Sequence, residues 1–167
     1  MKKILLILAV AVSSLLAQSQ NIEVGEFQKA FKPIIEASTH GYDTQSTSFN
    51  LPAATSTEYI VDESVGKTSF RAVYACTGRD ASKKLKAHLA MHVESTLPAG
   101  DFKKVQGYGA QYFDYLKYTF EYNTDVYAET KKRPTIEIGA LKVGKEYVVE
   151  VLISEPYFRD QYTPKWN

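Results

Sequence analysis

Cysteine is almost absent from this sequence: Cys76 is the only one among 167 residues. A lone cysteine excludes any intramolecular disulfide, even in an oxidising compartment, so the folded state depends on the burial of apolar side chains. An excess of charge is also missing, since 20 Lys and Arg balance 19 Asp and Glu. Such a balance provides no long-range field, and we therefore expect neither nucleic acid nor an anionic membrane as a partner.

Long apolar runs are missing except at the N-terminus. There, Lys2 and Lys3 precede the apolar residues 4–12, and Ala17 follows as a small residue at a plausible cleavage point. The run is shorter than the roughly 20 residues that a permanent transmembrane helix needs. We therefore predict a signal peptide over residues 1–17. The mature domain, residues 18–167, is then exported to the periplasm or the extracellular space without a membrane anchor.

The sequence motifs of common enzyme classes are missing as well. Val61 stands where a phosphate-binding loop ending in Gly66-Lys67-Thr68 needs its first glycine. Tyr112 stands where a dinucleotide-binding loop that starts at Gly107 needs its third glycine. No serine lies in a G-x-S-x-G sequence. A non-enzymatic protein is therefore the leading expectation.

Two segments have the periodicity of amphipathic helices, one over residues 23–37 and one over residues 81–97. In each, apolar residues recur at spacings of three and four, which places them on one stripe. These are Phe27, Phe31, Ile34 and Ile35 in the first, and Leu85, Leu89, Val93 and Leu97 in the second. Pro33 can kink the first helix. We expect Asp80 to cap the second helix, and Lys84 and Lys86 to lie on its polar side.

Most of the remaining chain is rich in β-branched and aromatic residues, which favour strands. We predict strands over residues 58–62, 67–76, 102–106, 112–122, 135–143 and 146–154. Consecutive strands with short connections usually pair antiparallel. The sequence thus predicts a single α+β domain: one antiparallel sheet of about five strands with two amphipathic helices on one face. We expect the aromatic tail, residues 155–167, to dock onto this body.

Several short motifs follow one another in a recognisable layout. They are the helix pattern Phe27, Phe31, Ile34 and Ile35, the step Leu51-Pro52-Ala53, the helix end Leu97-Pro98, and a strand through Tyr147-Val148-Val149 that closes at Pro156. In this layout the mature chain resembles small exported α+β proteins of unknown function. The resemblance implies no activity and no functional residues.

His88 and His92 are the sharpest candidates for chemistry. Histidines four residues apart share one helix face and can chelate one divalent metal, with zinc as the metal to consider. A third ligand is not evident from the spacing, although Glu94, Cys76 or His40 could converge in space. The simpler interpretation is that both imidazoles pack at the edge of the core, and we expect no cofactor.

Cys76 offers a second chemical hypothesis. It lies at a predicted strand end just before a helix, where a helix N-terminus lowers a thiol pKa, and a histidine could act as its base. The competing interpretation is a small apolar residue, because free cysteine is among the residues most often buried.

Tyrosine is the one residue type in clear excess, with 12 in the chain and six between residues 108 and 127. Its apolar body and polar tip suit binding interfaces and platforms that stack sugars, although tyrosine is also common in ordinary strands. We predict a secreted or periplasmic non-enzymatic binding domain whose protein or glycan partner contacts Tyr118, Tyr122 and Trp166. The alternative is a metal-dependent protein or hydrolase-like enzyme that uses His88 and His92 with Cys76.

Overall fold

The structure is a computed structural model, and it describes residues 22–63, 66–99, 102–107, 111–119 and 134–156. Its helices and strands, in chain order, are α2 (Val24–His40), β1 (Ser56–Asp62), β2 (Lys67–Cys76), α3 (Arg79–Thr96), β3 (Lys103–Gly107), β4 (Tyr112–Thr119), β5 (Thr135–Val143) and β6 (Glu146–Ser154). The predicted signal peptide, and the predicted tail from residue 157 onward, lie outside the described residues.

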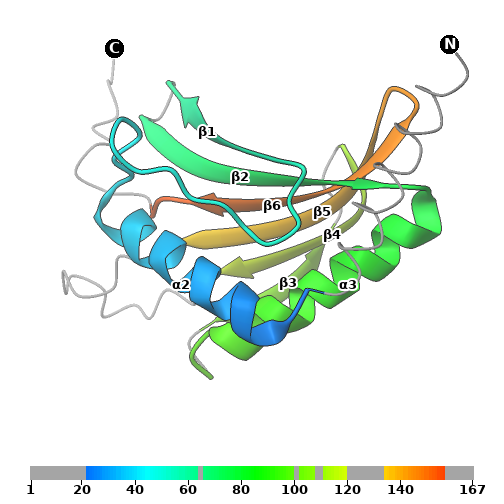
Figure 1. Cartoon of the computed structure of the whole chain (residues 1–167), viewed down its shortest axis with the longest axis horizontal. Helices are drawn as coiled ribbons and strands as arrows, with labels where there is room; N and C mark the ends of the chain where they lie inside the picture. Colours follow the sequence, from blue (N-terminus) through cyan, green and yellow to red (C-terminus); the bar gives the residue numbers. More distant parts are fainter. Residues whose placement is uncertain (1–21, 64–65, 100–101, 108–110, 120–133, 157–167) are drawn as a thin grey trace, which may run out of the picture.

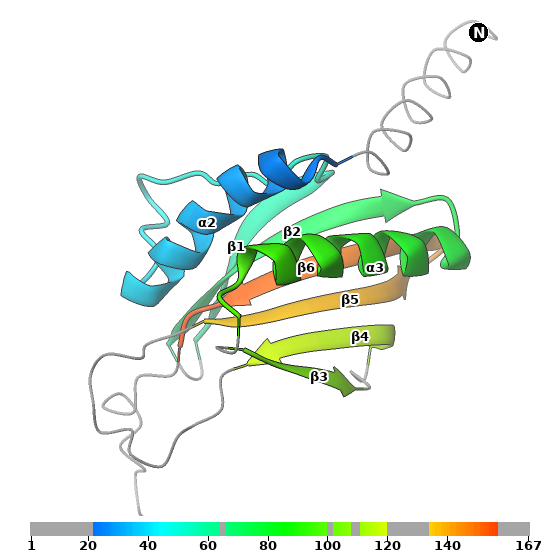
Figure 2. The same cartoon turned by 90° about the horizontal axis from the view of Figure 1, so that it is seen from below.

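The six described strands form one antiparallel sheet in the order β1-β2-β6-β5-β4-β3. Both helices cover the same face of this sheet (Figures 1 and 2). The α+β prediction is confirmed, with six strands in place of about five. Helix α3 explains the order of the strands. It carries the chain from β2 to β3 at the far edge, and β4, β5 and β6 then return strand by strand to pair with β2.

Helix α2 buries three of the four residues of the predicted stripe, whereas Ile35 is half-buried, and the helix runs three residues further than predicted, to His40. Phe27, Phe31 and Ile34 are fully buried against the sheet and α3. Pro33 lies on the solvent side of the helix and does not end it.

Leu97 of the predicted stripe follows the last residue of α3 and is half-buried. Helix α3 buries the other three residues of that stripe but corrects two details. It begins at Arg79 with Gly78 as the N-cap, so the prediction that Asp80 caps it is wrong; Asp80 lies in the first turn, where its charge complements the helix dipole. The prediction that Lys86 lies on the polar side is also wrong. Only 5% of Lys86 is exposed, and its ammonium group pairs with Asp114 of β4, because α3 lies close enough to the sheet to cover this side too.

The strands match the predictions closely. The bounds of β2, β5 and β6 are those expected, whereas β1 begins two residues earlier and β3 is displaced by one residue. Strand β4 runs from Tyr112 to Thr119, and the predicted extension to residue 122 lies outside the described residues. Gly144 has a φ of 60°, which is the left-handed conformation that the tight β5–β6 turn requires.

The hydrophobic core lies between the helices and one face of the sheet. Side chains alternate along each strand, and Phe70, Tyr74, Val149, Val151 and Ile153 belong to the face that the helices cover. No helix among the described residues has the length and apolarity needed to cross a membrane.

Candidate functional site

The other face of the sheet, which we call the open face, is covered by neither α2 nor α3. Strand pairing arranges its side chains in rows that cross the sheet. One row consists of Glu58, Arg71, Leu152, Glu137, Lys117 and Val105. The next consists of Ser56, Val73, Glu150, Gly139, Tyr115 and Gly107. Polar and aromatic side chains therefore occupy the middle of this face.

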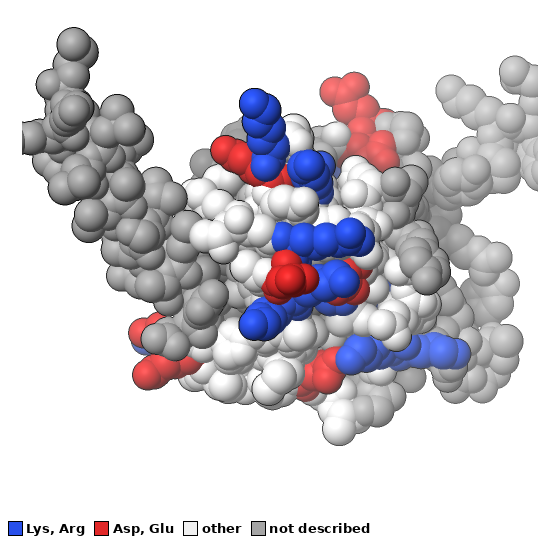
Figure 3. Space-filling model, turned by 90° about the vertical axis from the view of Figure 1, so that its right-hand side faces the viewer, with Lys and Arg blue, Asp and Glu red and all other residues white. Residues whose placement is uncertain are grey.

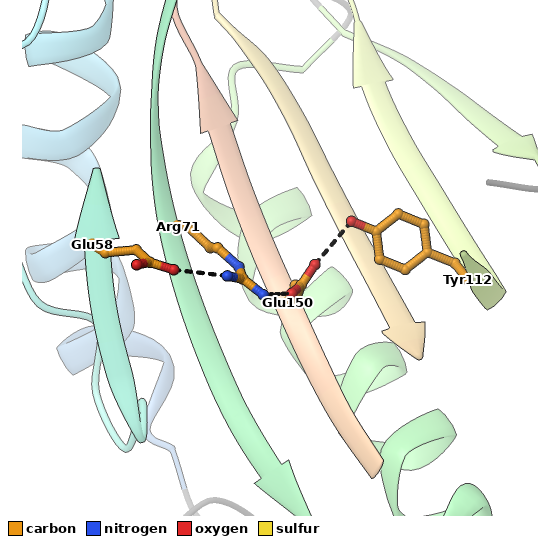
Figure 4. A network of polar contacts seen from close by, with 4 residues as sticks. All are labelled: Glu58, Arg71, Tyr112 and Glu150. Atoms are coloured by element: carbon orange, nitrogen blue, oxygen red, sulfur yellow. Dashed lines mark hydrogen bonds and ion pairs between the residues drawn. The ribbon is translucent and has the colours of Figure 1, made fainter. Parts of the chain in front are cut away.

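A polar network links four strands across the open face (Figure 4). Arg71 of β2 donates from Nη1 to Oε1 of Glu58 on β1, at 2.7 Å, and from Nη2 to Oε1 of Glu150 on β6. The hydroxyl of Tyr112, from β4, donates to Oε2 of Glu150 at 2.9 Å. Both carboxylate oxygens of Glu150 are thus bound, one by a cation and one by a phenol.

Glu150 is the unusual member, because only 5% of it is exposed although it carries a carboxylate. A buried charge needs charged or hydrogen-bonding partners to offset its loss of hydration. Partial burial disfavours the charged guanidinium of Arg71 and acts to lower its pKa. The hydrogen bonds and opposite charges of Glu150 and Glu58 outweigh this effect, so the pKa of Arg71 is raised. Burial and the neighbouring Glu150 raise the pKa of Tyr112 to about 12, so the phenol keeps the proton that it donates.

Tyr112 reaches Glu150 across strand β5 (Figure 4). Its ring lies over Gly139 of that strand. An ideal Cβ built on Gly139 would lie 2.8 Å from Cγ of Tyr112 and closer still to two other ring atoms. Any residue other than glycine at this position would therefore displace the ring. Glycine weakens a strand interior, and a close approach of this kind is the physical reason for its presence.

Tyr112 and Tyr115 form an aromatic pair beside the network. Their ring centroids are 5.2 Å apart and their planes differ by 19°, so the rings are stacked. Tyr115 lies between two glycines of the same row, Gly139 and Gly107, and both tyrosines are half-buried. Burial and Glu137 raise the pKa of Tyr115, which also keeps this phenol protonated. We call the two rings the tyrosine platform.

A second ion pair borders the tyrosine platform. Nζ of Lys117 lies 3.2 Å from Oε1 of Glu137, and the side chain of Lys117 is 39% exposed. The open face therefore presents cations, carboxylates and phenols held in place by one another. This arrangement can hydrogen-bond a ligand and stack against it.

The predicted metal ligands lie elsewhere, between α3 and the start of α2. Nε2 of His92 is 2.9 Å from Nε2 of His88, so one imidazole donates a hydrogen bond to the other. Only 2% of His92 is exposed, and its ring stacks on Phe27 with centroids 5.3 Å apart. Burial, then the nearby His88, lower the pKa of His92. Packing at the edge of the core accounts for both histidines.

Among the residues that the structure describes, no third ligand joins the histidine pair. Within the described part of the chain, no three His, Cys, Asp or Glu side chains gather where they could hold a metal ion. Glu94 instead accepts hydrogen bonds from Lys104 and Tyr118. The zinc site therefore stays a hypothesis.

Cys76 is half-buried at the end of β2, and its thiol donates to the carbonyl oxygen of Tyr74 at 3.7 Å. Burial raises its pKa to about 11, so the thiolate that a nucleophile needs is disfavoured. The small-apolar interpretation explains this environment better than the catalytic one.

The predicted binding residues are only partly described. Tyr118 is 2% exposed, lies on the helix-covered face and donates to Glu94 of α3 at 2.8 Å, so it presents no exposed ring to a partner. Tyr122 and Trp166 lie outside the described residues. The aromatic side chains that the structure does place on the open face are Tyr112 and Tyr115, both from the tyrosine-rich stretch noted in the sequence.

The described residues on the face shown in Figure 3 form no surface of one charge sign. Basic and acidic side chains are interspersed there over the described residues. Near the start of α3, the guanidinium of Arg79 lies 4.9 Å from the ring centroid of Phe113, and Nζ of Lys142 lies 5.5 Å from that of Tyr147. These cations cover half-buried rings of the domain itself.

Comparison with known proteins adds no assignment, because the sequence matches no protein-family model and no curated protein sequence.

Proposed function

We propose that this chain is an exported, non-enzymatic binding domain and that the open face of its sheet is the binding site. The observation that carries the proposal is the network in which Arg71, buried Glu150 and Tyr112 connect across strands that are far apart in sequence. The apolar leader at the N-terminus supports export.

The network favours binding because it fixes side chains before a ligand arrives. Arg71 is held between two carboxylates, and Tyr112 is held between Gly139 below its ring and Glu150 at its hydroxyl. A ligand then meets groups whose side-chain entropy is already lost, which leaves more of the contact energy for affinity. Buried ion pairs contribute little to stability by comparison with apolar residues of similar size.

Site-specific photo-cross-linking in the producing cells tests the proposal. Val105, on the open face at the β3 edge, and Met91, on α3, are both large exposed apolar residues, at 39% and 66% exposure. With p-benzoylphenylalanine in place of Val105, irradiation should yield covalent adducts in the envelope or secreted fraction, because the label lies beside Lys117 on the open face. The same label in place of Met91 should yield none of them.

Adducts of either a protein or a glycan support the proposal when they depend on the Val105 position. The proposal is wrong if the Val105 label gives no adduct, or if both labels give the same ones.

A further inference from the structure

We infer that the ligand of the open face is a neutral oligosaccharide, an inference that rests on the binding function proposed above. Three features of the open face support a neutral oligosaccharide: the internal pairing of its charges, the shape and chemistry of the tyrosine platform, and the position of the exposed apolar side chains.

The charges of the two central rows are directed at one another. Arg71 binds Glu58 and Glu150, and Lys117 binds Glu137. The charges of the described pairs already offset one another, so these pairs offer little net charge to an ionic ligand. A neutral ligand leaves them intact, since a guanidinium has five N–H donors and a carboxylate has about four acceptor positions. Sugar hydroxyls both donate and accept, so they match a surface on which cations and carboxylates alternate.

The tyrosine platform supplies the contact that sugar rings require on their C–H faces. Tyr112 and Tyr115 are stacked, half-buried and bordered by the Lys117–Glu137 pair. Tyrosine offers an apolar ring and a hydroxyl in one rigid side chain. The close approach over Gly139 and the hydrogen bond to Glu150 hold the first ring flat against the sheet.

The exposed apolar side chains argue against a protein ligand on this face. A stable protein interface needs about 800 Å² on each partner and an apolar centre surrounded by polar groups. Of the large exposed apolar residues of the described strands, Ile60 and Val105 lie on the open face of the two edge strands β1 and β3, and Val143 lies at the end of β5 next to the β5–β6 turn. Five strand spacings of about 4.8 Å separate those edges, and the polar network lies between them. The polar network thus lies between apolar side chains at the edges, which is the reverse of a protein interface with an apolar centre and polar surroundings.

Calorimetric titration of the mature protein tests the inference, with cellohexaose, maltohexaose, chitohexaose and xylohexaose as neutral probes and hexagalacturonate as the anionic one. We expect at least one neutral probe to bind, with an affinity that is the same at low and at high salt. Tyr115→Ala should weaken that binding about tenfold, because it removes one of the two rings of the tyrosine platform. Tyr147→Ala is the matched control: it removes a half-buried tyrosine from the helix-covered face and should leave binding unchanged.

Lys117→Ala is a second variant for the case in which Tyr115→Ala does not fold, as judged by circular dichroism. It changes a side chain at the border of the platform and should weaken binding several-fold. The inference is overturned if no neutral probe binds, if hexagalacturonate binds in a salt-sensitive way instead, or if Tyr147→Ala reduces binding as much as Tyr115→Ala. If adducts at Val105 still form in that case, the binding function stands with a different ligand. If adducts at Val105 are missing, the binding function itself fails.

Discussion

Gly139→Ala is the sharpest perturbation of the open face, because it adds one methyl group where the ring of Tyr112 already lies. The ring must move, and its hydroxyl then loses the 2.9 Å hydrogen bond to Glu150. A hydrogen bond to a charged group contributes about 1.5–3 kcal/mol. Alanine is favoured over glycine in a strand by about 0.5–1 kcal/mol. The difference predicts that Gly139→Ala lowers the free energy of unfolding by about 1–2 kcal/mol. For a domain of this size, this corresponds to a fall of about 2–8 °C in melting temperature.

A double-mutant cycle with Tyr112→Ala, measured by urea denaturation, separates the clash from other effects. Once the ring is removed, Gly139→Ala should become neutral or stabilising by up to about 1 kcal/mol, since only the strand preference remains. Gly107→Ala is the matched control, because its Cβ would lie an ordinary 3.5 Å from the ring of Tyr115. It should show no coupling to Tyr112→Ala. Equal destabilisation by Gly139→Ala in the presence and absence of the ring would refute the reasoning.

Three further predictions concern the core, the histidine pair and export. Leu89→Ala should lower the free energy of unfolding by about 2–5 kcal/mol, because Leu89 is fully buried. Lys84→Ala, at an exposed position of the same helix, should change it by less than about 0.5 kcal/mol. Equal values for the two variants in denaturant titration would contradict the packing of α3. Burial and the nearby His88 lower the pKa of His92, so the folded state disfavours its protonation and stability should fall as the pH drops below the unfolded value of about 6.5. His92→Leu should flatten this pH dependence in melting curves. Zinc should not shift the melting temperature of the unmutated protein, and a zinc-dependent rise would support the metal hypothesis instead. The exported protein should begin at or near Gln18 by N-terminal mass spectrometry, and an intact Met1 would contradict the signal peptide.

Local patterns were sufficient to predict the helices and strands. The spacing of Phe27, Phe31 and Ile34 identifies the buried side of α2, and that of Leu85, Leu89 and Val93 identifies the buried side of α3. Lys86 was misplaced because periodicity describes one stripe, whereas the width of the buried surface depends on how closely the helix approaches the sheet. Its charge is accommodated by Asp114, a residue that the helix pattern could not supply.

The open face could not be predicted in the same way, because it depends on strand pairing. A β-bulge shifts the register between Tyr112 and Asp114. Strict alternation would place Tyr112 on the same face as Leu116 and Tyr118, under the helices. The extra residue turns Tyr112 to the open face instead, where it pairs with Leu141. Alternation alone also does not decide which face the helices cover, and Tyr118, the tyrosine chosen from the sequence as a binding residue, is buried on the covered face.

Two local signals did point to the network, although neither identified its partners. Glu150 lies between Val149 and Val151 in an otherwise apolar part of β6, and Gly139 interrupts β5. A charge inside an apolar strand calls for a partner, and a glycine inside a strand indicates a close approach. Only the pairing of β2 with β6, and of β5 with β4, reveals that the partners are Arg71 and Tyr112.

Stability alone does not account for this combination of residues. Val148 and Leu152, which flank Glu150 on the open face of β6, show that apolar side chains fit there, and an apolar residue in place of Glu150 would avoid the loss of carboxylate hydration. Gly139 weakens β5 in the adjacent position. Two residues that each carry an intrinsic cost, a buried charge and a glycine within a strand, therefore occur side by side, and together they hold Tyr112 and Arg71 in fixed positions on the open face. We propose that a requirement to present those two groups to a ligand underlies the presence of Glu150 and Gly139, and on this ground we propose the open face of the sheet as the functional surface of the domain.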